Sequence, residues 1–244
     1  MTNTVSARRY AALALAHRWF AFLETEWGDL PGHLEMFDSS VTLSGRRGTV
    51  AFARDRNELV SWFAAVPDAT SSHHLLHSVW TDGGPDAGSL SFVVAYQAPK
   101  GDLPAAGSII HYTTSVAFRN GAARFVALDK TPVLSDTDPV YQPSWAAHRA
   151  QAYLYTLLAS PDLDPDAAQA VGHPDDATIR AWSAGTMGPA GSYAVTIAVQ
   201  ERDSEPRVAR WHFDDSRDAL LPTPVSTPHL HRLPLTNTDS APTD

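Results

Sequence analysis

Two histidines on one predicted strand are the first candidates for proton chemistry in this sequence. Residues 72–81 follow the alternation of a β-strand, which puts His73 and His77 on the same face. Histidine titrates near neutral pH and can act as an acid or a base without a large pKa shift. At the usual strand rise the two lie about 13 Å apart, too far to share one metal ion. Both are therefore candidate catalytic residues, the alternative being partly exposed histidines with satisfied hydrogen bonds.

A carboxylate and a phenol later in the chain are two further candidates. Asp129 follows an apolar run at residues 125–128. A carboxylate at the mouth of a pocket can have a raised pKa and act as a general base. The alternative is a surface ion pair with Arg124 or Lys130. Tyr112 can donate a hydrogen bond to a developing enolate oxygen, or it can pack in the core.

The element that must position these groups is a long β-hairpin over residues 108–130. Asn120-Gly121 predicts its turn, because both residues tolerate the positive φ that a tight hairpin needs. The run before the turn would span about 37 Å, and an antiparallel hairpin of that length twists and curls. Its concave face needs a cover, and helices packed there enclose a pocket. The candidate pocket face of the first strand carries Ile110, Tyr112, Thr114, Val116 and Phe118.

The segments before the hairpin supply that cover. Apolar residues at helical spacing predict a helix over residues 8–27, which a Gly- and Pro-containing stretch ends. Helices gathered on one side of antiparallel strands predict an α+β fold. The further elements expected are a short helix at 33–37, a strand at 41–43, a turn at 46–48, a helix at 49–65, strands at 72–81 and 89–97, and a loop at 98–107.

This order of elements resembles the nuclear transport factor 2-like superfamily, also described as SnoaL-like, over residues 8–133. The resemblance implies a cystatin-like α+β cone, in which a curled antiparallel sheet wraps over the N-terminal helices. Polyketide cyclases, ketosteroid isomerases and scytalone dehydratases are among its members. The motifs that carry the resemblance are Phe37-Asp38-Ser39-Ser40-Val41, the histidine strand at 73–79, and Phe118-Arg119-Asn120-Gly121 leading to Leu128-Asp129.

The resemblance also implies roles for particular positions. A histidine on this strand often faces the pocket in these families; His73 fits that position, and His77 lies where a polar residue is common. SnoaL-like cyclases resemble this sequence in having an acidic residue near the end of the last strand, here Asp129. Ketosteroid isomerases can hold a carboxylic acid where this chain has Thr114. The position that matches their catalytic base holds no residue that could remove a proton from carbon. These departures argue against a steroid-isomerase mechanism.

An acid pair is the remaining catalytic alternative. Asp38, Asp55 and Glu58 could supply one, as in the epoxide-opening members of the superfamily. Asp38 is expected instead to cap a turn, and the other two lie one helical turn apart among arginines, which is typical of a solvated face.

The second half of the chain repeats parts of the first. Residues 17–25 align without gaps on residues 148–156, and residues 87–97 align on residues 190–200, with five identities in each stretch. The segment between these two aligned stretches is shorter in the second half of the chain. The second half would therefore lack the third helix or the histidine strand. Chance similarity in an Ala-rich chain is the alternative.

Four parts are therefore expected. A SnoaL-like domain at 8–133 holds the pocket, and 134–144 is a linker. Residues 145–225 form a shorter, degenerate second SnoaL-like repeat that packs against the first in place of a homodimer partner. Residues 226–244 form a flexible tail. The protein is then a monomer with pseudo-dimeric halves or a homodimer.

Composition excludes several classes of function. The chain has 244 residues, no cysteine and a net charge of −9 without a basic block, which argues against thiol chemistry and nucleic-acid binding. The longest apolar run is too short for a membrane span, so a soluble cytoplasmic protein is the default expectation. No metal-ligand set, phosphate-binding glycine loop or dinucleotide fingerprint occurs, so neither a metal nor a cofactor is expected.

The function expected is that of a cofactor-independent cyclase, isomerase or dehydratase acting on a hydrophobic small molecule in natural-product metabolism. His73 or Asp129 would move a proton and Tyr112 would stabilise an oxyanion, with His77 as a further catalytic candidate. The alternatives are a non-catalytic member that binds a ligand or protein, and an epoxide hydrolase with a carboxylate pair. The residues expected to shape the cavity are Trp19, Trp62, Phe92, Thr114 and Phe118.

Overall fold

A computed structural model gives the fold of most of the chain. No helix in the part that it describes is long and apolar enough to cross a membrane. The described residues are 4–25, 30–66, 70–100, 103–135, 143–160, 178–187, 192–200, 207–214 and 231–232.

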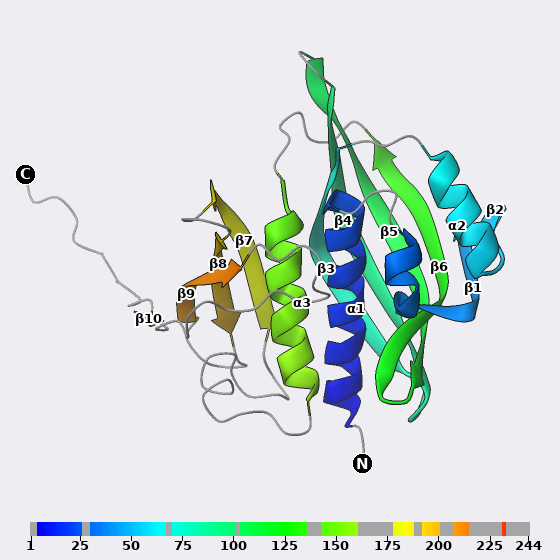
Figure 1. Cartoon of the computed structure of the whole chain (residues 1–244), viewed down its shortest axis with the longest axis horizontal. Helices are drawn as coiled ribbons and strands as arrows, with labels where there is room; N and C mark the ends of the chain where they lie inside the picture. The colour runs from blue at the N-terminus through cyan, green and yellow to red at the C-terminus, as the bar shows by residue number, and fades with distance from the viewer. Residues whose placement is uncertain are drawn as a thin grey trace, which may run out of the picture.

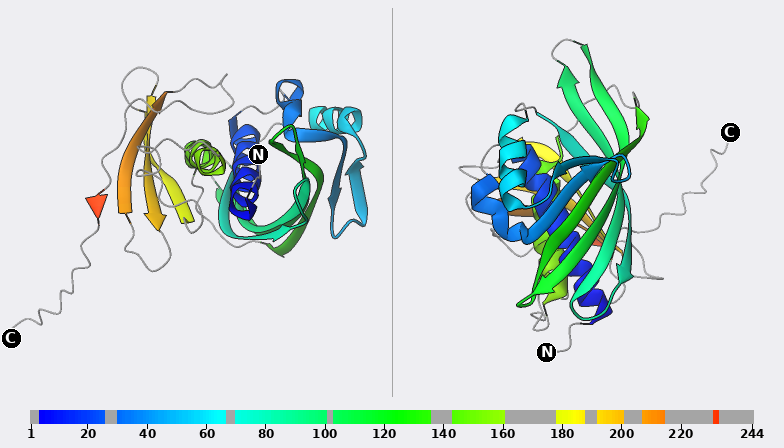
Figure 2. Two further views of the ribbon diagram at one scale, coloured as in Figure 1. Left: turned by 90° about the horizontal axis from the view of Figure 1, so that it is seen from below. Right: turned by 90° about the vertical axis from the view of Figure 1, so that its right-hand side faces the viewer.

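The first unit is a curled sheet with helices on its concave side (Figure 1). Its strand order is β2-β1-β6-β5-β4-β3, with β1 parallel to β6 and the other neighbours antiparallel. Seen from below, the sheet curves around α1 (Figure 2), which confirms the α+β class and the curled sheet. The elements are α1 (Val5–Thr25), η1 (Leu30–Met36), β1 (Phe37–Gly45), β2 (Val50–Ala53), α2 (Arg56–Ala65), β3 (Ser72–Asp82), β4 (Ala87–Lys100), β5 (Leu103–Arg119) and β6 (Ala122–Ser135).

Strands β5 and β6 form the hairpin that the sequence predicts. Asn120 and Gly121 take positive φ angles of 53° and 80°, as the predicted tight turn requires. Register shifts between Ile109 and Ile110 and between Ser115 and Val116 mark bulges, which increase the curl of the sheet. The predicted inner face of β5 is buried along its length.

Helix α1 is buried on nearly every side, which differs from the single apolar stripe in the sequence pattern. Ala14 and Ala21 lie off that stripe, and both are at least 94% buried. The reason is that α1 lies between the concave face of the first sheet and helix α3 (Trp145–Ala159) of the second unit (Figure 2). A helix covered on two sides has no polar face to present to water.

The second unit places α3 against a smaller antiparallel sheet of order β10-β9-β8-β7. Helix α3 runs antiparallel to α1 beside it (Figure 1). The strands are β7 (Thr178–Met187), β8 (Ser192–Gln200), β9 (Arg207–Asp214) and β10 (His231–Arg232).

Two expected elements are wrong. The helix predicted at 49–65 is a strand, β2, followed by the shorter α2, because the Asp55 side chain accepts a hydrogen bond from the Glu58 backbone N–H and caps the helix there. The loop predicted at 98–107 is largely strand, since β4 and β5 stay paired to their ends, with Ala98 opposite Ala106. The linker prediction lies mostly outside the described residues, although β6 extends to Ser135.

Candidate functional site

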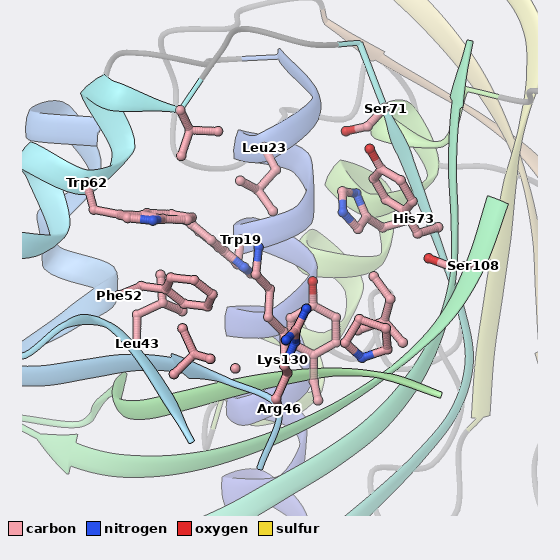
Figure 3. Close-up of a pocket in the computed structure, with 17 residues that line it drawn as sticks. Trp19, Leu23, Leu43, Arg46, Phe52, Trp62, Ser71, His73, Ser108 and Lys130 are labelled. Carbon is pink, nitrogen blue, oxygen red and sulfur yellow. The ribbon is translucent and has the colours of Figure 1, made fainter. Parts of the chain in front are cut away.

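A cavity of about 600 Å³ opens between α1, the turn after β1, α2 and the concave face of the sheet. Figure 3 shows aromatic side chains on one side of it and His73 on the other. A cavity of this size and mixed lining is typical of small-molecule sites. The lining residues are Trp19, Leu23, Leu43, Gly45, Arg46, Val50, Phe52, Trp62, Val66, Ser71, His73, Tyr96, Ser108, Ile110, Tyr112, Lys130 and Pro132.

His73 is held at the cavity wall by a buried carboxylate. Its Nδ1 lies 3.3 Å from Glu24 Oε1, and the same oxygen accepts the His73 backbone N–H at 2.7 Å. The ring stacks on Phe20 with centroids 4.9 Å apart. Since Nδ1 faces Glu24, Nε2 is the ring nitrogen left for a bound molecule.

Burial decides the protonation state of this pair. Desolvation lowers the pKa of His73 to about 3, with smaller contributions from the charges of Lys130 and His74. Desolvation also raises the pKa of Glu24. The charge of His148 and the hydrogen bonds from Ser144 and the His73 backbone lower this pKa, but they do not outweigh the desolvation. His73 is therefore neutral at pH 7, and its Nε2 can accept a proton while Nδ1–H donates to Glu24.

The second unit supports this pair from behind. Ser144, just before α3, donates its hydroxyl to Glu24 at 2.8 Å, and the hydroxyl oxygen accepts the His73 backbone N–H at 3.1 Å. His148 Nε2 bonds the His73 carbonyl oxygen, and His148 Nδ1 lies 2.6 Å from Nδ1 of His17 on α1. This network assigns the tautomers: His148 donates through Nε2 and accepts through Nδ1, so His17 Nδ1 carries the donated proton.

Two phenols lie on the cavity wall near His73. Tyr96 packs edge-on against the His73 ring at 5.3 Å, and Tyr112 stacks on Phe92 at 5.0 Å. Burial raises the pKa of both phenols, so both keep their protons at neutral pH. Protonated phenols in a poorly hydrated cavity are suitable donors to an oxygen that develops negative charge.

His77 lies on the outer face of β3, which corrects the predicted alternation of this strand. His73 pairs with Tyr96 and Leu75 with Val94, but the register shifts between Leu75 and His77. A bulge adds one residue, so every later side chain moves to the opposite face. His77 is exposed as a result and does not line the cavity.

Asp129 also lies outside the cavity lining. Its carboxylate accepts hydrogen bonds from the Ser44 and Thr131 hydroxyls and from the backbone N–H groups of Arg47 and Gly48. Burial would raise the pKa of Asp129, but these hydrogen bonds outweigh it and lower the pKa. This carboxylate holds the turn after β1 in place.

The five residues expected to shape the cavity divide into two groups. Trp19 and Trp62 line it. Phe92 lies behind Tyr112 in the aromatic core, Thr114 donates to the Leu90 carbonyl oxygen at 2.8 Å, and Phe118 packs on Trp80. These last three are not among the lining residues, because the cavity occupies only one end of the inner face of the sheet.

The three carboxylates considered for an acid pair each make structural contacts elsewhere. Asp38 accepts from the Ser40 backbone N–H and lies 3.7 Å from Arg119, and Asp55 caps α2. The Glu58 carboxylate accepts the Arg54 backbone N–H at 2.9 Å. No Asp or Glu is among the described residues that line the cavity.

Two functional candidates do not follow from the sequence pattern. Glu24 sits at the end of α1, where a carboxylate normally reads as solvated, yet its side chain is 1% exposed. The sequence suggests Lys130 only as an ion-pair partner of Asp129, but its side chain points into the cavity (Figure 3). Strand alternation was the available signal for Lys130, since it lies opposite Tyr112 in the pairing of β5 and β6.

The described ranges hold no group of three or more His, Asp or Glu side chains arranged to bind a metal ion. No protein-family model matches the sequence, and a comparison with curated proteins gives no significant match. The comparison with solved structures does give matches.

Three solved structures illustrate the likeness. A candidate scytalone dehydratase from Novosphingobium aromaticivorans has a TM-score of 0.49 and 14% identity, covering 59% of this chain and 95% of that one. A protein with a cystatin-like fold from Nostoc punctiforme has a TM-score of 0.43 and 19% identity, covering 58% and 100%. A LinA-type hexachlorocyclohexane dehydrochlorinase from Novosphingobium barchaimii has a TM-score of 0.45 and 13% identity, covering 56% and 96%.

The strand order and the helices on the concave side confirm the curled antiparallel sheet over N-terminal helices that the sequence predicts. Two of the matched structures are described as having a cystatin-like fold, one of them as NTF2-like. At identities below 20%, an NTF2-like fold by itself carries no reaction and no substrate.

Proposed function

We propose that this NTF2-like protein is a cofactor-independent enzyme, a cyclase, isomerase or dehydratase of natural-product metabolism that acts on a hydrophobic small molecule. The observation that carries the proposal is the buried pair of Glu24 and His73 at the wall of an aromatic cavity. A histidine held by a carboxylate with its second nitrogen free is the usual arrangement of a general base.

The chemistry follows from the positions of these groups. Nε2 of His73 takes a proton from a carbon of the bound molecule, and the imidazolium that forms is stabilised by the Glu24 carboxylate 3.3 Å from Nδ1. Tyr112, with Tyr96 beside it, donates to the oxygen on which negative charge develops. His73 then returns the proton to another carbon in an isomerisation, or to a departing hydroxyl group in a dehydration.

Tyr112→Phe is expected to lower the rate about 10- to 100-fold, because one donor to the developing oxyanion is lost while packing is kept. The assay is the exchange of carbon-bound hydrogen for deuterium in D₂O, followed by NMR over a panel of hydrophobic ketones and hydroxyketones. Wild type is expected to exchange hydrogen in at least one compound above the buffer rate.

The matched control is Tyr153→Phe, since Tyr153 lies on α3 and packs against Trp211 and Phe213 of the second sheet. Equal loss of rate in both variants would remove Tyr112 from the proposed mechanism. Exchange at the buffer rate for every compound would favour a non-catalytic, ligand-binding role instead.

We further propose that residues 145–225 are the shortened second copy expected from the alignment. The support is a self-complementary contact: His17 and His148, which align with each other, meet at 2.6 Å. Tyr155 aligns with Glu24, and the reciprocal pairs His17–Tyr155 and Glu24–His148 both occur. Reciprocal contacts of this kind characterise an interface with twofold symmetry.

The two sheets support the same interpretation. Strands β7, β8 and β9 follow one another as neighbours, as β3, β4 and β5 do. In this comparison β7 corresponds to β3, the strand that carries His73. The segment missing from the second copy would therefore lie between α3 and β7. Residues 161–177 in that region lie outside the described ranges.

A further inference from the structure

The charged residues of the cavity all have the same sign. Lys130 and Arg46 line it, no described lining residue is acidic, and His73 is neutral at pH 7. Neither cation forms an ion pair with a carboxylate within the described part of the chain. Figure 3 labels both among the side chains drawn around the cavity, below His73 in this view.

Lys130 is held among aromatic rings. Its Nζ lies 5.4 Å from the centroid of Phe52 and 5.2 Å from that of Trp62, both of which are cation–π distances. The side chain is half-buried, and burial lowers its pKa. A cation in such a place has lost much of its hydration, so an anionic ligand would restore a favourable interaction.

The neighbouring carboxylate does not neutralise it. Asp129 precedes Lys130 on β6, and strand alternation sends the two side chains to opposite faces. The Asp129 carboxylate is engaged by Ser44, Thr131 and the turn after β1. The same turn carries Arg46, whose backbone N–H donates to the Lys130 carbonyl oxygen at 3.2 Å, so the two cations are positioned by one hydrogen-bonded unit.

We propose that the cavity binds a hydrophobic carboxylic acid, with the carboxylate at Lys130 and Arg46 and the apolar body against Trp19, Phe52 and Trp62. The inference rests on the proposed function in that it names the substrate class of the same cavity. A monocarboxylate fits better than a phosphate, because one half-buried lysine and one arginine in an apolar lining compensate a single negative charge.

Binding of the acid also activates the base. The charge of Lys130 is one cause of the low basicity of His73. A carboxylate beside Lys130 offsets that charge, so His73 becomes a better proton acceptor when the acid is bound than in the empty cavity. The anchoring group thereby links substrate recognition to proton transfer.

The test compares acids with their neutral methyl esters. The probes are 2-naphthylacetate, 4-phenylbutyrate and decanoate, each paired with its ester, and binding to the full-length protein is measured by calorimetry at pH 7. We expect wild type to bind at least one acid about tenfold or more tightly than its ester, as a charge-assisted hydrogen bond provides. Lys130→Met should lose this preference while keeping its affinity for the ester, and Lys130→Arg should retain it.

The outcomes separate this proposal from the catalytic one. His73→Gln should keep the preference for the acid even where it exchanges no hydrogen, so failure of the proposed reaction leaves the binding result intact. Circular dichroism and the midpoint of thermal unfolding check that Lys130→Met is folded. The proposal is overturned if no acid of the panel binds more tightly than its ester, or if folded Lys130→Met keeps the preference.

Discussion

His73→Ala is expected to lower turnover by about 10²- to 10⁴-fold, the range that a positioned general base contributes. The variant removes the imidazole from the cavity wall and leaves the backbone hydrogen bonds of residue 73 to Glu24 and Ser144 in place. These backbone bonds should hold β3 in place in the variant. The hydrogen bond from Ser144 to Glu24, which joins the two units, is also retained. The fold should therefore survive, which circular dichroism checks.

The control for this variant lies on the same strand. His77→Ala removes an identical side chain from the outer face of β3, beyond the bulge, and should leave the rate within about twofold of wild type. Deuterium exchange measures both variants under one set of conditions. Equal rates for His73→Ala and wild type would remove His73 from the mechanism.

Glu24→Gln separates positioning from proton transfer. The amide keeps the shape of the side chain but loses the charge that stabilises an imidazolium at His73. We expect the rate to fall while binding of a neutral ligand is unchanged. A structural role alone would lower thermal stability without this difference between rate and affinity.

Removing residues 145–225 is expected to cause aggregation or dimerisation. This deletion uncovers the side of α1 that packs on α3, including Tyr10 and His17, which are at least 99% buried in the intact chain. An exposed apolar helix face of this kind is a protein-interaction surface or an aggregation hazard. Size-exclusion chromatography with light scattering measures the outcome, and a well-behaved monomer would contradict the packing role of the second unit.

A point variant tests the same interface in the full chain. Ala152 lies between His148 and Tyr155 on the face of α3 that meets α1, and it is 1% exposed. Ala152→Arg places a charge and extra volume there and should lower the free energy of unfolding by about 3 kcal/mol or more. Ala64→Arg on the exposed side of α2 is the matched control, with a change of about 0.5 kcal/mol or less.

The sequence predicts the architecture because its signals are local. Helical spacing in α1, the Asn120-Gly121 turn and the apolar face of β5 each follow from the residues near them. The sequence pattern does not place the boundary at Asp55, because the charged and polar residues at 54–58 also fit the exposed face of one continuous helix. The boundary is set by the Asp55 side chain, which caps α2. The paired ends of β4 and β5 were missed because their Pro and Gly residues are typical of loops.

The candidate site is less predictable because it depends on contacts between distant residues. A one-residue bulge between Leu75 and His77 moves His77 away from the cavity. The residues around this bulge include no Gly or Pro that would indicate it in the sequence. Glu24 is a buried partner of His73 because Ser144 and His148 cover it. Both of these residues lie at least 120 positions after Glu24 in the sequence. The sequence therefore predicts that His73 faces a pocket, but not what orients it.

The central claim is that His73 is neutral, with its proton on Nδ1 toward Glu24 and the lone pair of Nε2 facing the cavity. The most direct measurement is the ¹⁵N NMR spectrum of the His73 ring in the intact protein between pH 8 and pH 5. Since the pKa is lowered to about 3, protonation should begin only below this range, and Nε2 should keep the shift of an unprotonated nitrogen throughout. A spectrum with the proton on Nε2, or with a doubly protonated ring at pH 6, would contradict the account.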